Sequence, residues 1–233
     1  MTERQQADSD RSTAIARALA LVATYHASAR AELIQRVGHR DTSITLFLGA
    51  TAVVLGAAFR GDGLDKGDAV LLLVIPLLGF GATLIHVQHN GVIGTIGEYL
   101  GIELRETTRA LMLESGLRPD LMPADWDSSD TLFGVRTHIL NRRWSALTLL
   151  VAPQIVAVLL AAAELPADPA SAIGTYLAVA AIALSLYSLN RSHIIREERI
   201  VRLREHKAAE HARPEERSPE GSSGQQPDAA VWE

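Results

Sequence analysis

Two histidines stand close together in the longest uncharged run of the chain. His86 and His89 lie three residues apart, with Gln88 and Asn90 beside them. On a helix this spacing places both imidazoles on one face, where two rings can hold zinc or nickel or respond to pH. The sequence offers no third ligand nearby. The alternative is that the rings cap a helix end or bond to a neighbouring helix, so we predict no metal site.

Four carboxylates form a second candidate for cation binding. They are Asp120, Asp125, Asp127 and Asp130. The prolines in this segment predict a loop over residues 116–129. A helix–loop–helix calcium site needs glycine at its sixth position and glutamate at its twelfth. Counted from Asp125, these positions hold Asp130 and Arg136, so we expect a solvated loop that Trp126 anchors on neighbouring helices.

Four glycines after the histidines invite comparison with a dinucleotide-binding turn. They are Gly91, Gly94, Gly97 and Gly101. That turn needs two glycines one residue apart between a strand and a helix. Spacings of three, three and four instead place all four on one helical face, which indicates either close helix packing or a flexible joint. We predict no cofactor.

Enzymatic signatures are missing from the sequence. It contains no nucleophile elbow, phosphate loop or paired catalytic carboxylates. The lack of cysteine excludes disulfides and thiol nucleophiles. A formal charge of −5 argues against nucleic acid as a partner. We therefore predict a protein that is not an enzyme and has no catalytic residues.

Four long segments without Asp, Glu, Lys or Arg dominate the chain. They are Thr42–Phe59, Ala69–Gly97, Trp144–Ala163 and Pro169–Asn190. About 20 apolar helical residues cross a hydrocarbon core about 30 Å thick. In lipid the backbone must satisfy its own hydrogen bonds, so the segments should be helices. The sequence predicts an all-α membrane protein with four transmembrane helices.

The polar groups inside these spans are uncharged. The absence of charge disfavours an ion-coupled transporter. Thr51, Thr83 and Gln154, together with Pro76 and Pro153, either line a narrow path or hold helices together. The small pair Ala52 and Gly56 leaves the same choice open.

The distribution of arginine predicts the orientation. Arginines are frequent before the first span, between the second and third spans, and after the fourth. Positive residues stay on the cytoplasmic side. Both termini and the middle segment should therefore be cytoplasmic, with two parallel-oriented hairpins in the inner (plasma) membrane. Whether these hairpins are a true repeat stays open.

The chain divides into seven expected segments. They are a flexible N-terminus 1–11, a cytoplasmic amphipathic helix 12–41, a first transmembrane hairpin 42–90, a cytoplasmic helical segment 91–143 with the loop 116–129, a second transmembrane hairpin 144–190, a cytoplasmic helix 191–212 and a disordered tail 213–233.

Periodic apolar residues describe the cytoplasmic helices. A stripe from Ile15 to Val37 should pack on a partner helix or lie on the membrane. The helix 191–212 should be a solvated extension whose only apolar face is formed by Ile194, Ile195, Val201 and Leu203.

Several short motifs carry a resemblance to known families. Arg30–Arg36, His86–Asn90 and Ile96–Leu100 resemble a group of uncharacterised bacterial four-span integral membrane proteins. Residues 12–115 are also similar to the SLATT family of bacterial membrane effectors, in the placing of Tyr25-His26, His89 and Tyr99-Leu100. The second hairpin departs from that family. The resemblance implies pore formation in response to a nucleotide signal.

Two functions remain open from the sequence. One is an oligomeric, channel-like or signal-responsive membrane effector whose cytoplasmic helices receive a signal. The other is a non-conducting scaffold that anchors a cytosolic partner to the membrane. The expected partners are the lipid bilayer and, depending on the function, further copies of the chain or a cytosolic protein.

Overall fold

A single helix, α1, runs from Glu3 to Ala58 in the computed structural model, which describes residues 3–60, 64, 66–117, 144–165 and 168–212. Its 56 residues correspond to about 84 Å at 1.5 Å per residue. No proline interrupts this stretch, so nothing forces a break between the amphipathic part and the first span. The two segments expected over 12–41 and from 42 onward are thus one rod. The rod also includes residues 3–11, for which the sequence predicted a flexible N-terminus.

The second rod contains one break and one irregular turn. It comprises α2 (Lys66–Leu72), α3 (Val74–Tyr99), a π-helical turn η1 (Leu100–Leu104) and α4 (Arg105–Glu114). The ring of Pro76 clashes with the carbonyl four residues earlier in a regular helix, and that residue is Leu72, where α2 ends. The far end is closed at Gly116, whose φ is 73°. There the amide of Leu117 donates to the Met112 carbonyl at 2.9 Å.

The remaining helices lie on the other side of α3. A π-helical turn η3 (Leu147–Val151) leads into α7 (Ala152–Glu164), with Pro153 in its first turn. Then α8 runs from Pro169 to Ala212. Asp168 caps α8, because its carboxylate accepts bonds from the amide and the hydroxyl of Ser171 at 2.9 and 3.1 Å.

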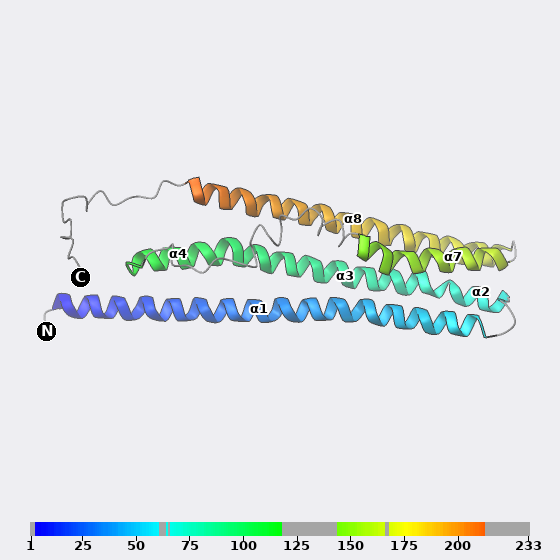
Figure 1. Ribbon diagram of the computed structural model, residues 1–233, viewed down its shortest axis with the longest axis horizontal. Coiled ribbons are helices and arrows are strands. Elements are labelled where there is room, and N and C mark those ends of the chain that lie inside the picture. The colour runs from blue at the N-terminus through cyan, green and yellow to red at the C-terminus, as the bar shows by residue number, and fades with distance from the viewer. Residues whose placement is uncertain (1–2, 61–63, 65, 118–143, 166–167, 213–233) are drawn as a thin grey trace, which may run out of the picture.

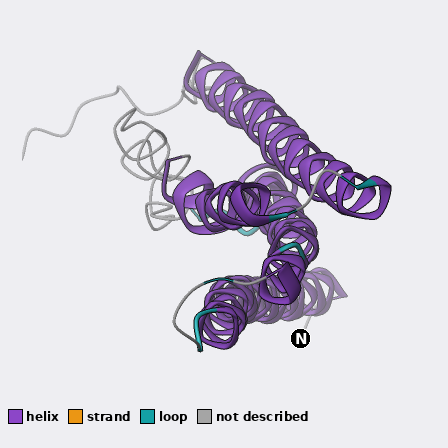
Figure 2. Ribbon diagram, turned by 90° about the vertical axis from the view of Figure 1, so that its right-hand side faces the viewer, coloured by secondary structure: helices purple, strands orange, loops and turns teal. Residues whose placement is uncertain are grey.

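The rods lie roughly parallel, with the second rod in the middle. Along the molecule α3 packs against α1 on one side and α8 on the other (Figure 1). The C-terminal end of α1, which leads to α2, lies on the same side of the molecule as the C-terminal end of α7, which leads to α8 (right in Figure 1). Viewed from that end, the described part consists of helices and loops without strands (Figure 2).

An apolar core joins the helices in the half that contains the predicted spans. Its fully buried members include Ala58, Leu72, Ile75, Leu150 and Ala157. These residues come from α1, α2, α3, η3 and α7, so the spans form one packed unit. The outward faces are apolar too, as in Val53 and Leu159, which are 72% and 66% exposed. An apolar surface of this kind suits a lipid solvent.

Four helices of the described chain are long and apolar enough to cross a membrane. They lie within Ser9–Ala58, Gly67–Glu114, Trp144–Glu164 and Pro169–His206. This confirms the prediction of an all-helical chain with four candidate membrane spans. The loop residues 118–129 with their carboxylates, and the tail 213–233, lie outside the described residues.

The apolar stripes predicted outside the spans differ between α1 and α8. In α1 the residues Ile15, Val22 and Val37 are buried or half-buried, which favours packing on a partner helix over lying on the membrane. The expectation for the end of α8 was right for Leu203 and wrong for the other members of the predicted apolar face. Ile194 and Val201 are about half exposed, whereas Ile200 and Leu203 are buried. The buried face of α8 is therefore another one, and it carries arginines.

Candidate functional site

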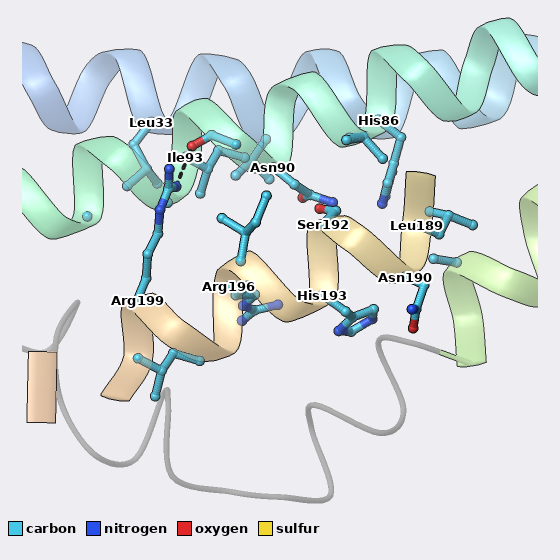
Figure 3. A pocket seen from close by; sticks show the side chains of 18 of the residues that line it. Leu33, His86, Asn90, Ile93, Leu189, Asn190, Ser192, His193, Arg196 and Arg199 are labelled. Atoms are coloured by element: carbon cyan, nitrogen blue, oxygen red, sulfur yellow. Dashed lines mark hydrogen bonds between the residues drawn. The ribbon is translucent and has the colours of Figure 1, made fainter. Parts of the chain in front are cut away.

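A cavity of about 660 Å³ lies between α3 and α8, where the predicted spans give way to the charged part of the helices. Leu33 and Val37 of α1 close one side, and Ala146 and Leu147 close the side near the spans. Its lining is mainly apolar, with polar groups projecting from α3 and α8 (Figure 3). This volume is within the range of ligand pockets in proteins.

Glycines form the α3 wall of the cavity. Gly91, Gly94, Gly97 and Gly101 all line it. The helix continues through them, so they are not a break in the rod. Nor do they bring helix backbones into close contact, since a Cβ on Gly91 or Gly97 would meet no atom within 4 Å. The missing side chains instead leave space between the two helices.

Arg199 crosses this space and links α8 to α3. Its Nη1 donates to the Gly91 carbonyl at 2.8 Å, as the dashed line in Figure 3 marks. A Cβ on Gly94 would collide with the same guanidinium. The Arg199 Nε lies 3.6 Å from the Glu98 carboxylate, which also accepts from Arg202 Nε at 3.0 Å. Glu98 therefore holds two arginines of α8.

A second, weaker contact extends this connection along α8. His206 Nε2 lies 3.5 Å from a carboxylate oxygen of Glu106. With Glu98, this gives two acidic side chains on the central rod that face basic groups of α8. The pairs are partly exposed, so each contributes about 0–1 kcal/mol. They lie along the line where α8 packs against the central rod.

Arg196 lines the cavity without an acidic partner among the described lining residues. Among the described residues that line the cavity, none is Asp or Glu. Burial, together with the nearby Arg40 guanidinium, lowers the pKa of Arg196 below its ordinary value. Arg40 itself contacts Asp41 at 2.8 Å and donates to Asn90 Oδ1 at 3.4 Å. The site therefore has an excess of positive charge.

The two histidines of α3 turn towards different neighbours. His86 is buried and lines the cavity near Leu189 (Figure 3). His89 instead stacks on His39 of α1, with ring centroids 6.0 Å apart and planes 18° apart. The predicted shared face does not gather them around one point. Within the described residues no three His, Cys, Asp or Glu side chains could hold a metal ion.

Of the polar residues inside the spans, Gln154 packs between two helices, whereas the hydrogen bonds of Gln154 and Thr83 stay within one helical stretch. Gln154 of α7 is fully buried against Gly79 of α3, where a Cβ would collide with its side chain. Its Nε2 donates to the Leu150 carbonyl at 2.6 Å. Its Oε1 has no hydrogen-bond partner among the described residues. The buried Thr83 donates to the Gly79 carbonyl at 2.8 Å.

The small pair on α1 does not serve this purpose. Ala52 and Gly56 face away from the other described helices, and a Cβ on Gly56 would meet no atom within 4 Å. They do not hold the helices of one chain together.

Comparison of the chain with protein-family models, with curated proteins and with solved structures finds no match. The interpretation of the site therefore rests on its geometry and charge.

Sequence reasoning singled out half of this site. It identified His86, Asn90 and the glycines, but not the α8 face that completes the cavity. The missed signal was the spacing of Ser192, Arg196, Arg199 and Leu203, which recur every three or four residues. Because two of these positions hold arginine, a search for apolar residues at helical spacing does not identify this face of α8 as buried.

Proposed function

We propose that the chain is a signal-responsive integral membrane protein in which cytoplasmic helices control the packing of four membrane spans. The observation that supports this most is the continuity of the helices. α1 and α8 pass from the uncharged segments into the charged ones without interruption. A helix transmits a shift or rotation along its axis, so a ligand or partner at one end can bias packing at the other.

We further propose two hairpins of the same orientation, with both termini in the cytoplasm of a bacterial inner membrane. The arginine distribution supports this sidedness. The shared end of the two connections, seen in Figure 1, supports the hairpins. Tags placed after Glu233 and in the connection at Gly63 test the arrangement in intact cells. An impermeant reagent should label only the tag at Gly63; labelling of the C-terminal tag would contradict the orientation.

Any conduction would involve several copies of the chain. The interior of the four spans is packed, and its polar members Gln154 and Thr83 are fully buried. This packing favours a path between copies over a path through one chain. The exposed small pair on α1, by contrast, offers an outward face at which copies can approach.

Flux through liposomes tests the effector function. Purified protein should release a small dye or ions from proteoliposomes, and Gly56→Leu should reduce the release if copies meet at this face. Gly38→Leu is a matched control, because Gly38 also has open space around its Cβ position but lies outside the predicted span. Equal release by both variants would contradict a role for the Gly56 face.

The alternative is a non-conducting scaffold for a cytosolic protein. It is favoured by apolar side chains on the cytoplasmic half of α1, among them Tyr25 and Ile34, which are 57% and 69% exposed. Proteoliposomes that stay tight, combined with loss of a co-purifying protein in Tyr25→Ser, would support the scaffold and contradict the effector.

A further inference from the structure

We propose that the cavity between α3 and α8 binds the phosphate headgroup of an anionic phospholipid, with Arg196 holding the phosphate. The proposal uses the membrane insertion put forward above but not the response to a signal. If the protein inserts into membranes but does not bind anionic phospholipids, this inference is wrong and the proposed function is unaffected.

The charge of the cavity selects an anion. Arg196 lines the cavity, and none of the described lining residues carries a negative charge. The nearby Arg40 is paired with Asp41, so Arg196 is the guanidinium that supplies the uncompensated positive charge. The neighbouring Arg199 already contacts Glu98, so Arg196 is the guanidinium left for a ligand. Guanidinium groups bind phosphate with two parallel N–H donors, and this geometry makes arginine a preferred phosphate ligand.

Polar uncharged groups lie close to this cation. Asn90 of α3 and Asn190, Ser192 and His193 of α8 line the same cavity (Figure 3). They supply donors and acceptors suited to the ester oxygens and hydroxyls of a headgroup. Asn190 ends the fourth uncharged segment, and Ser192 and His193 follow it. This position places them at the depth where lipid headgroups lie.

The apolar walls favour a lipid over a water-soluble phosphate. On the side of the spans the cavity is lined by Val87, Leu147, Leu186 and Leu189. A small hydrophilic phosphate would leave this surface without a partner, whereas an acyl chain covers it and gains the free energy of apolar burial. The glycine wall leaves room for such a chain, since Gly91 and Gly97 have open space in front of them.

Lipid retention by charge-matched variants tests the role of Arg196. The full-length protein is purified in mild detergent, and bound lipids are identified by native mass spectrometry. Arg196→Gln should bind added phosphatidylglycerol about tenfold more weakly than the wild type, the effect of losing one hydrogen-bonded charge. Arg191→Gln is the control, because Arg191 is exposed on the same helix and does not line the cavity. Equal binding by the two variants would overturn the proposal.

A second pair of variants tests the cavity itself without changing charge. Gly97→Leu puts a side chain into the open space and should displace phosphatidylglycerol, whereas Gly38→Leu on α1 should not. Both replace a helical glycine that has open space before it, so both should fold. Retention of the lipid by Gly97→Leu would contradict binding at this place.

The source of the phosphate is settled by competition. Phosphatidylcholine should bind about tenfold more weakly than phosphatidylglycerol, because the arginines repel the positive charge of its choline group. Water-soluble glycerol phosphate should not displace phosphatidylglycerol at equal concentration. Displacement by glycerol phosphate would show that the cavity takes a free organic phosphate, and equal binding of phosphatidylcholine would show that charge does not select the lipid. Either result overturns the proposal.

Discussion

The contact between Gly79 and Gln154 allows a sharp test of the packing inside the spans. A Cβ built on Gly79 would overlap the Gln154 side chain, including its Cγ, so the stem of the side chain as well as its end must move. Gln154 is fully buried, so its side chain cannot move out into solvent. Overpacking of this kind costs about 1–3 kcal/mol. Gly79→Ala should therefore destabilise the helix bundle by about that amount.

Gly81 provides a matched control two residues further along the same helix. A Cβ there would meet no atom within 4 Å. Because alanine is the better helix former, Gly81→Ala should be neutral or stabilise the protein by up to about 1 kcal/mol. For a chain of this size 1 kcal/mol shifts the melting temperature by about 2–4 °C. The two variants should therefore differ clearly in thermal unfolding in detergent.

A double-mutant cycle then identifies the cause. Gln154→Ala removes the side chain that the new methyl group would meet, so Gly79→Ala should cost almost nothing in that background. The coupling free energy between the two sites should be about 1–3 kcal/mol. If Gly79→Ala and Gly81→Ala had the same effect, or if the cost persisted without Gln154, the packing inferred for α3 and α7 would be wrong.

Three further predictions address the connections between helices. Glu98→Gln loses two partly exposed contacts with arginines of α8. In thermal unfolding it should therefore lower the stability of the docked α8 by about 1 kcal/mol at low salt and by less at high salt. Glu103→Gln, at an exposed position of the same rod, is the control and should show no such salt dependence. Asp168→Ala removes the cap of α8 and should cost about 1 kcal/mol, whereas Asp168→Asn, which keeps an acceptor, should stay near the wild type in the same assay. Thr42→Pro should break α1 at the predicted membrane boundary and so change the distance between spin labels at the two ends of α1. Thr42→Ala is the control that leaves the helix unbroken. An unchanged distance in the proline variant would contradict a continuous α1. The chain has no cysteine, so labels can be introduced at chosen sites without removing native thiols.

The candidate site was only partly predictable from the sequence. The helical face of Gly91, Gly94, Gly97 and Gly101 follows from spacing alone, but spacing does not say what lies opposite. Both sequence interpretations, close packing and a flexible joint, treated the face as a contact or a hinge. The structure instead places a long side chain from α8 across it, at a separation of 108 residues between Arg199 and Gly91. Local sequence carries no information about contacts of that range.

The histidines illustrate the same limit. Their spacing correctly places them on neighbouring positions of a helix, yet His86 faces α8 and His89 stacks on α1. A central helix has partners on two sides, and positions three apart point in directions that differ by about 60°. Which partner each ring meets depends on where α1 and α8 pack.

The sequence by itself determined that the described chain is helical, with four segments apolar enough to cross a membrane. Long uncharged segments must be helices in lipid because only a helix satisfies its backbone hydrogen bonds within one segment, and the proline positions indicate where the rods are interrupted. Only the tertiary structure decided which faces meet. It alone placed Arg196 in a cavity without a carboxylate from the described lining residues, with Arg40 of α1 nearby. Helix formation is governed by neighbours along the chain, whereas the charge of a cavity is the sum over helices that are distant in sequence.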